Sequence, residues 1–170
     1  TTPEPCFGLE LRGKIHIENC QITARSKAKH ACGVLARGAA ASPLLRGCTI
    51  RDCGHAGVLL ATSAHASLVD SDVRDCGGCG LLVLANCVLD VQNGRFSGCG
   101  DGALAIVGRA AASLSGCELS DNGGASGSAS VSAKAHGRLV MRECQVRGAS
   151  GMGVQLSDGA EGNLASCKLI

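Results

Sequence analysis

The stretch CTIRDCGHAGVLL at residues 48–60 returns in altered form as SDVRDCGGCGLLV at residues 71–83 and as GRFSGCGDGALAI at residues 94–106. The same pattern starts at residues 20, 48, 71, 94, 117, 144 and 167, and the copy at residue 167 is truncated. Successive start positions are therefore separated by 28, 23, 23, 23, 27 and 23 residues. A repeat of this length is typical of proteins in which small units stack on one another.

Each copy carries the residue pattern of short strands. An apolar residue stands two positions after every start position, and the residue between them is compatible with water in every copy. Another apolar residue stands three positions before each start. A second strand follows a glycine in most copies, as at Gly57-Val58, and a third lies near Ala66. Such alternation indicates strands. About three strands joined by Gly-, Asn- or Asp-containing turns match one coil of a parallel β-solenoid.

The pattern predicts an all-β fold, a right-handed single-stranded parallel β-helix of about six coils of about 23 residues, with the handedness usual for parallel crossovers. Residues 1–170 are expected to form a single domain, with residues 1–13 as an N-terminal cap. The two longer steps place insertions near Arg25–His30 and Gly123–Lys134. The last copy stops in mid-coil at Ile170, so we expect a fragment of a longer chain, or an end that pairs with another molecule.

Composition narrows the partners that such a fold would have. The formal net charge is only +2, and the only aromatic residues are Phe7 and Phe96. A near-neutral chain without aromatic stacking platforms is a poor candidate for nucleic-acid binding. No apolar run is long enough to cross a bilayer, so no membrane partner is expected. The core is expected to consist of small aliphatic side chains that stack closely.

The order Asn/Asp-Cys-x-Ile, then a turn, then Gly-Val/Leu resembles the β-helix repeats called CASH, named for carbohydrate-binding proteins and sugar hydrolases. Similar repeats occur in NosD-like proteins and in the substrate-binding region of β-helix F-box proteins. The resemblance covers nearly the whole chain. It implies the β-helix fold, and it implies either polysaccharide chemistry or protein binding, because these families include both.

The chain has twelve cysteines, and eight of them fall into two columns of the repeat rather than being scattered. One column has cysteine at five of the seven start positions, with Ser71 and Gly94 at the others, which indicates a small buried residue. Cys53, Cys76 and Cys99 form another column. Stacked coils lie about 4.8 Å apart, so neighbouring thiols approach one another.

Three interpretations of the cysteine columns remain open. We favour a ladder of buried, inert thiols. A Cys53–Cys76 disulfide or a thiolate metal site of Cys53, Cys76 and Cys99 with His55 are the alternatives. No metal or other cofactor is expected. Many unpaired thiols favour a reducing compartment, which predicts an intracellular, cytoplasmic protein.

The candidate binding residues are Arg51, Asp52, His55, Arg74 and Asp75. The 23-residue step places the pair Arg51-Asp52 beside Arg74-Asp75, and these side chains are free of the predicted core. A polysaccharide lyase or epimerase would need clustered carboxylates and usually aromatic platforms. The acidic row is interrupted at Ser97-Gly98, and the chain has no Trp or Tyr.

The function predicted from the sequence is a non-catalytic β-helix scaffold. Solenoids present long rigid surfaces, so a protein partner is expected along a strand face or at the C-terminal end. End-to-end self-association is a further expectation. The alternative is a carbohydrate-binding or polysaccharide-modifying β-helix protein, which would use Asp52 and Asp75 as its carboxylates.

Overall fold

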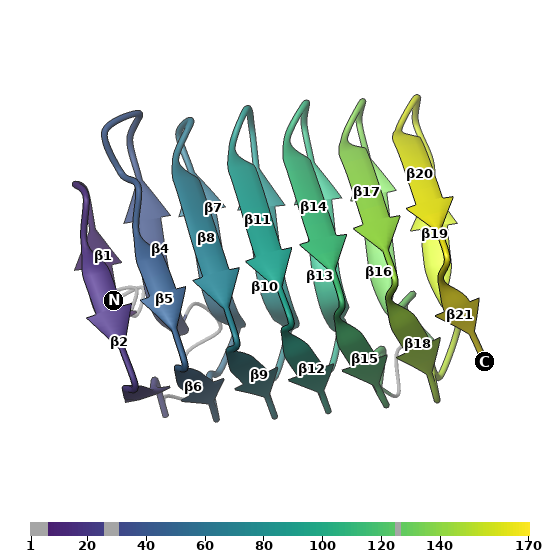
Figure 1. Ribbon diagram of the computed structural model, residues 1–170, viewed down its shortest axis with the longest axis horizontal. Coiled ribbons are helices and arrows are strands. Elements are labelled where there is room, and N and C mark those ends of the chain that lie inside the picture. Colours follow the sequence, from purple (N-terminus) through teal and green to yellow (C-terminus); the bar gives the residue numbers. More distant parts are fainter. Residues whose placement is uncertain (1–6, 26–30, 125–126) are drawn as a thin grey trace, which may run out of the picture.

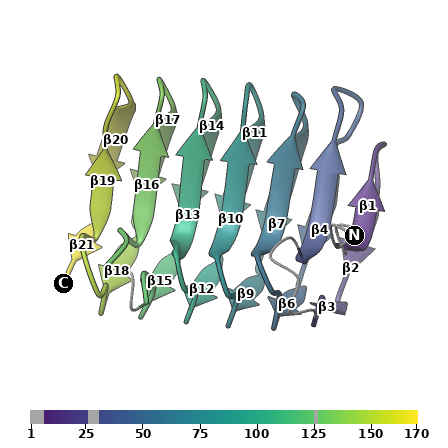
Figure 2. The ribbon, with the colours of Figure 1, turned by 180° about the vertical axis from the view of Figure 1, so that it is seen from behind.

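The computed structural model describes residues 7–25, 31–124 and 127–170, whose strands wind into seven stacked coils (Figures 1 and 2). Each coil contributes one strand to each of three parallel sheets, here called A, B and C. The prediction of an all-β parallel β-solenoid is confirmed. The predicted number of about six coils was too low, because the copies at Cys20 and Cys167 each complete a coil of three strands.

The strands of each sheet follow one another at every third position in the chain. Sheet A contains β1 (Phe7–Leu11), β4 (Cys32–Arg37), β7 (Ala56–Ala61), β10 (Cys79–Leu84), β13 (Gly102–Val107), β16 (Val131–Lys134) and β19 (Val154–Leu156). Sheet B contains β2 (His16–Glu18), β5 (Leu44–Arg46), β8 (His65–Val69), β11 (Val88–Gln92), β14 (Ala111–Ser115), β17 (Arg138–Arg142) and β20 (Glu161–Ala165). Sheet C contains β3 (Gln21–Thr23), β6 (Thr49–Arg51), β9 (Asp72–Arg74), β12 (Arg95–Ser97), β15 (Glu118–Ser120), β18 (Gln145–Arg147) and β21 (Lys168–Leu169).

The repeat start is a corner between sheets B and C. The sequence pattern did not reveal this corner. Leu68 and Val73 are five residues apart, so on one straight strand they would face opposite sides. Asp70 takes the left-handed conformation, with φ +50°, and turns the chain between β8 and β9. Both apolar side chains therefore point into the core, where each is fully buried.

The register stacks equivalent residues directly on one another. Leu68 lies between Leu45 and Val91, and Val73 lies between Ile50 and Phe96. All of these side chains are at most 1% exposed. The core is therefore a set of aliphatic ladders along the solenoid axis, and burial of these ladders is the main stabilising contribution.

Both predicted insertions lengthen the same corner, between sheets C and A. One lies between β3 and β4 and the other between β15 and β16. The predicted N-terminal cap contains β1, which pairs with β4 in the parallel register of the later coils. Residues 1–6 of that cap and residues 26–30 of the first insertion lie outside the described residues. Within the described ranges, no helix is long and apolar enough to cross a membrane.

Candidate functional site

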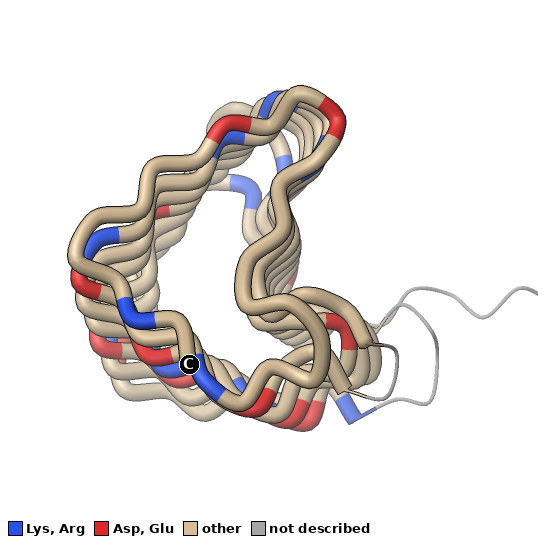
Figure 3. Tube along the Cα trace, turned by 90° about the vertical axis from the view of Figure 1, so that its right-hand side faces the viewer, with Lys and Arg blue, Asp and Glu red and all other residues tan. Residues whose placement is uncertain are grey.

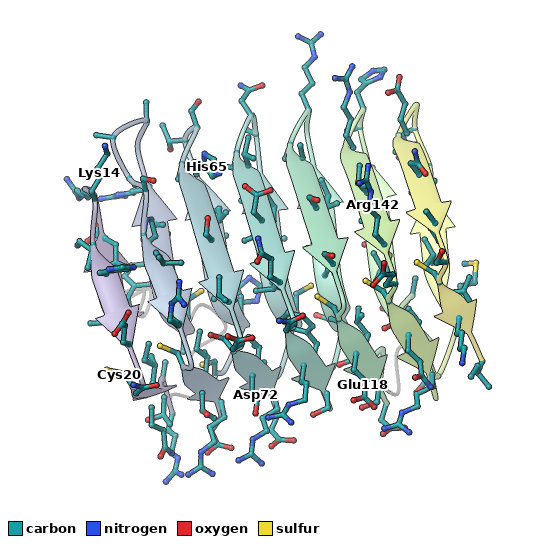
Figure 4. All side chains as sticks on the ribbon, in the orientation of Figure 1. Lys14, Cys20, His65, Asp72, Glu118 and Arg142 are labelled. Carbon is teal, nitrogen blue, oxygen red and sulfur yellow. The ribbon has the colours of Figure 1, made fainter. Side chains whose placement is uncertain are left out.

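The outer side of sheet C carries a row of charged side chains. Asp72, Arg95 and Glu118 lie on neighbouring strands in direct register. Arg95 donates two hydrogen bonds to Asp72, from Nε at 2.8 Å and from Nη2 at 2.9 Å. Glu118 is paired with Arg147 instead. Figure 4 shows Asp72 and Glu118 projecting from the outer side of sheet C, so the carboxylates of this face are engaged by neighbouring guanidinium groups.

The predicted Arg-Asp row is present, with its arginines in sheet C. Arg51 and Arg74 lie beside each other in register between β6 and β9. Each is near the aspartate that follows it, at 3.6 Å for Arg51 Nη1 to Asp52 Oδ2 and 3.9 Å for Arg74 Nη1 to Asp75 Oδ2. These are loose, partly exposed ion pairs, which contribute little to stability.

The aspartates of this row have a backbone role at the corner between sheets C and A. Asp52 and Asp75 both have φ +54°. Every equivalent position in the next coils also has positive φ, at Gly98, Asp121 and Gly148. Gly, Asn and Asp are the residues that tolerate this conformation best. The repeated aspartate is therefore explained by the shape of the corner, and Asp52 additionally accepts a hydrogen bond from Arg25 at 3.0 Å.

His55 is separated from the arginines by that corner. It directly precedes β7, where its backbone N–H donates to the carbonyl of Ala31 and its carbonyl accepts from Gly78, both at 2.8 Å. The residue is half-buried. The structure therefore brings Arg51 and Arg74 together on sheet C but places His55 at the entry to sheet A.

A depression lies further along the outer face of sheet C. Its floor is formed by Ser97 and Ser120, which are register partners on β12 and β15. Arg74 is the partner of Ser97 on one side, and Arg147 is the partner of Ser120 on the other. Because two small residues stand between two arginines, the surface sinks to form a hollow of ≈ 230 Å³. We call Arg74, Ser97, Ser120, Arg147 and the adjoining Arg95 the arginine-serine hollow.

The thiols of the column formed by Cys53, Cys76 and Cys99 are buried and form no disulfide. Cys53, Cys76 and Cys99 are each at most 2% exposed, and all three are free cysteines. The pKa of Cys76 is raised, because hydrogen bonds to the Cys53 and Cys99 thiols, and then burial, favour its protonated form. Within the described ranges, no group of three His, Cys, Asp or Glu side chains could hold a metal ion.

The outer side of sheet A carries a surface that the sequence reasoning missed. Seven aliphatic side chains point away from the core there and are not part of the core cluster. We call them the outer apolar row: Leu35, Leu59, Ala61, Leu82, Leu84, Ala105 and Val107. A signal was present in the sequence, since GVLL at residues 57–60 and GLLVL at residues 80–84 do not alternate. Continuous apolar runs are typical of parallel strands that are covered on both faces.

The register aligns the outer apolar row along the solenoid axis. Leu59 lies between Leu35 and Leu82, and Ala105 lies beside Leu82. Figure 3 shows that the wall formed by sheet A curves inward between its two corners, which makes its outer side concave. Leu35 is only 4% exposed, while the others are half-buried. The row is thus recessed, but it faces the outside of the solenoid.

The fold defines the class of protein as a parallel β-solenoid. Two overlapping segments, residues 6–119 and 32–170, match the family described as "Right handed beta helix region". Together they cover nearly the whole chain, and the chain belongs to this right-handed β-helix family. No curated protein is significantly similar to it.

Proposed function

We propose that the chain is a non-catalytic scaffold that binds a protein partner on the outer apolar row of sheet A. The observation that carries this proposal is the aliphatic character of both faces of sheet A. The inward side chains, such as Val58 and Leu60, already supply the core. Outward Leu59, Leu82 and Leu84 add nothing to that core, and contiguous apolar surface on a soluble protein marks an interaction site.

Charges at the two ends of the row indicate the chemistry of the partner. Arg37 lies beside Ala61 at one end, and Lys134 lies beside Val107 at the other. Arg37 Nε and Arg12 Nη2 lie 2.9 Å and 2.8 Å from the same carboxylate oxygen, Oε1 of Glu10. Because one carboxylate faces two guanidinium groups, that end of the row has an excess of positive charge.

Lys134 forms no ion pair among the residues that the structure describes. Four coil steps separate it from Arg37, or about 19 Å at the usual strand spacing. The proposed partner segment is therefore aliphatic in its centre and acidic at its two ends.

Two further considerations support the same proposal. The repeats resemble those in the substrate-binding region of β-helix F-box proteins, where a solenoid recognises protein. The eleven described cysteines are all free, which favours a reducing, intracellular compartment for the scaffold.

Selection from a display library of random 20-residue peptides tests the class of partner. The expected result is enrichment of peptides that combine Leu, Ile or Val with Asp or Glu, because this composition complements the outer apolar row and its flanking cations. Failure to enrich any peptide, or enrichment of basic peptides only, would contradict the proposal.

A glycan array and a uronate-lyase assay test the competing carbohydrate function. We expect no glycan binding and no turnover, because the carboxylates of sheet C are ion-paired and those of Asp52 and Asp75 occupy corner positions. Turnover that is abolished by Asp52→Asn or Asp75→Asn would overturn the scaffold proposal.

A further inference from the structure

The arginine-serine hollow has donors that nothing in the fold uses. Ser97 and Ser120 are half-buried on its floor, and neither hydroxyl has a hydrogen-bond partner within the described chain. Register spacing puts the two serines about 4.8 Å apart. An oxyanion whose oxygens are about 2.5 Å apart could accept a hydrogen bond from each of two donors at this spacing.

The guanidinium groups around the hollow leave it with net positive charge. Arg95 is held in place by two hydrogen bonds to Asp72, and Arg147 is held by Glu118. Arg74 has only the loose contact with Asp75 at 3.9 Å, so most of its donors are unused. Three cations and two carboxylates, Asp72 and Glu118, line the hollow.

Guanidinium groups suit this kind of binding, since their planar forks match carboxylate and phosphate oxygens. Because two of the three arginines are already fixed by ion pairs, they lose little conformational freedom when a ligand arrives. The third, Arg74, is exposed and can turn toward a ligand above the serines.

We propose that the arginine-serine hollow is an oxyanion-binding site for an acidic peptide, with Arg74, Ser97 and Ser120 as its principal donors. The ligand group is the carboxylate of Asp or Glu or the phosphate of a phosphorylated residue. This site lies on sheet C and is independent of the surface proposed on sheet A. Binding is electrostatic in part and weakens as salt is added.

The test compares three peptides by fluorescence anisotropy with the whole chain. One carries four aspartates between glycines, one carries phosphoserine in their place, and one carries asparagine. We expect the aspartate or the phosphoserine peptide to bind and the asparagine peptide to bind at least about tenfold more weakly, a ratio typical of charge-assisted hydrogen bonds. Whichever of the two charged peptides binds more tightly identifies the source of the oxyanion.

Variants locate the binding to the hollow. Arg74→Gln, and separately the double change Ser97→Ala with Ser120→Ala, should each weaken binding by about fivefold to tenfold. Arg46→Gln is the matched control, because Arg46 is similarly exposed and has an equally loose contact, 3.9 Å to Glu18, on sheet B. Circular dichroism spectra of all variants verify that the fold is retained.

Three results would overturn the inference. The asparagine peptide could bind as well as the charged ones, or Arg46→Gln could weaken binding as much as Arg74→Gln. An oligogalacturonate could also bind at the hollow while both charged peptides do not, which would assign the site to an acidic polysaccharide. None of these results bears on the outer apolar row, so the two proposals can fail separately.

Discussion

Gly57 shows how one residue sets the distance between two sheets. A Cβ at this position would lie 2.4 Å from Val73 Cγ1 and 2.7 Å from the carbonyl oxygen of Gly80. At the equivalent Gly33 and Gly80, a Cβ would lie 2.8 Å from a carbonyl oxygen of the next coil. In these three coils the absence of a side chain lets sheet A approach the core side chains of sheet C, whereas Ala103 and Ser130 occupy the same position in the two coils that follow.

Gly57→Ala is therefore expected to destabilise the protein by about 1–3 kcal/mol, the usual effect of overpacking. Urea denaturation measures the change in free energy of unfolding. Gly13→Ala is the control, because a Cβ at Gly13 meets no atom within 4 Å. Equal stability of the two variants would mean that the close approach of the sheets is not required.

The buried thiol of Cys79 makes the stability of the fold depend on pH in the alkaline range. Burial raises its pKa from 9.0 to about 12, with the charge of Asp101 as a smaller cause. The folded chain therefore keeps a proton that the unfolded chain releases, and the stability this contributes is present below pH 9 and is lost between pH 9 and 12.

Thermal unfolding measured from pH 8 upward should show a Tm that falls above pH 9. Cys79→Ala should make this fall shallower, and alanine fits because Ala56 occupies the equivalent position on β7. Cys20→Ala, which changes an exposed thiol, is the control. If Cys79→Ala has the same slope as the parent chain, the thiol does not control alkaline stability.

At the scale of the element, the corners decide which residues the repeat requires. Alternation along the strands of sheet C could be predicted from the sequence, because each of them has a polar residue immediately before its apolar residue. The corner itself could not be located, because Asp70 and Asp75 look like ordinary polar residues until their positive φ is known. For the same reason the aspartate row looked like a binding site, while its first role is to turn the chain.

Substitutions at Asp75 separate the backbone role from the role of the carboxylate. Asp75→Val should destabilise the chain by about 1–2 kcal/mol, since a β-branched residue is strained at φ +54°. Asp75→Asn should be close to neutral, because asparagine tolerates this conformation and the ion pair with Arg74 is loose. Both are measured by urea denaturation, and a large loss with Asp75→Asn would show that the charge itself is needed.

At the scale of the whole molecule, the step of 23 residues made most of the fold predictable. It aligned the core columns, and the number of coils was miscounted only because the terminal copies were treated as incomplete. The two surfaces were not predictable to the same extent. The outer apolar row lies in continuous apolar runs of the sequence, whose residues all looked like core residues. The arginine-serine hollow could not be predicted because it depends on which neighbouring side chains each arginine pairs with.

The last coil exposes side chains that belong to the core columns. Leu164 and Leu169 lie beside Met141 and Val146 in the register, yet they are 37% and 52% exposed. The 170-residue chain is therefore predicted to associate through this end at high concentration. Light scattering after size exclusion should show larger species that Leu164→Lys with Leu169→Lys removes, and a monomer at all concentrations would contradict this.

Mapping a selected peptide onto the solenoid tests whether a protein partner docks on the outer apolar row. The measurement is the Kd of one enriched peptide for the parent chain, for Leu59→Ser with Leu82→Ser, and for Val140→Ser as a half-buried, outward control on sheet B. We expect binding to be at least about tenfold weaker for the first variant, because apolar contacts are lost, and to be unchanged for Val140→Ser. Equal binding to all three proteins would contradict the proposal.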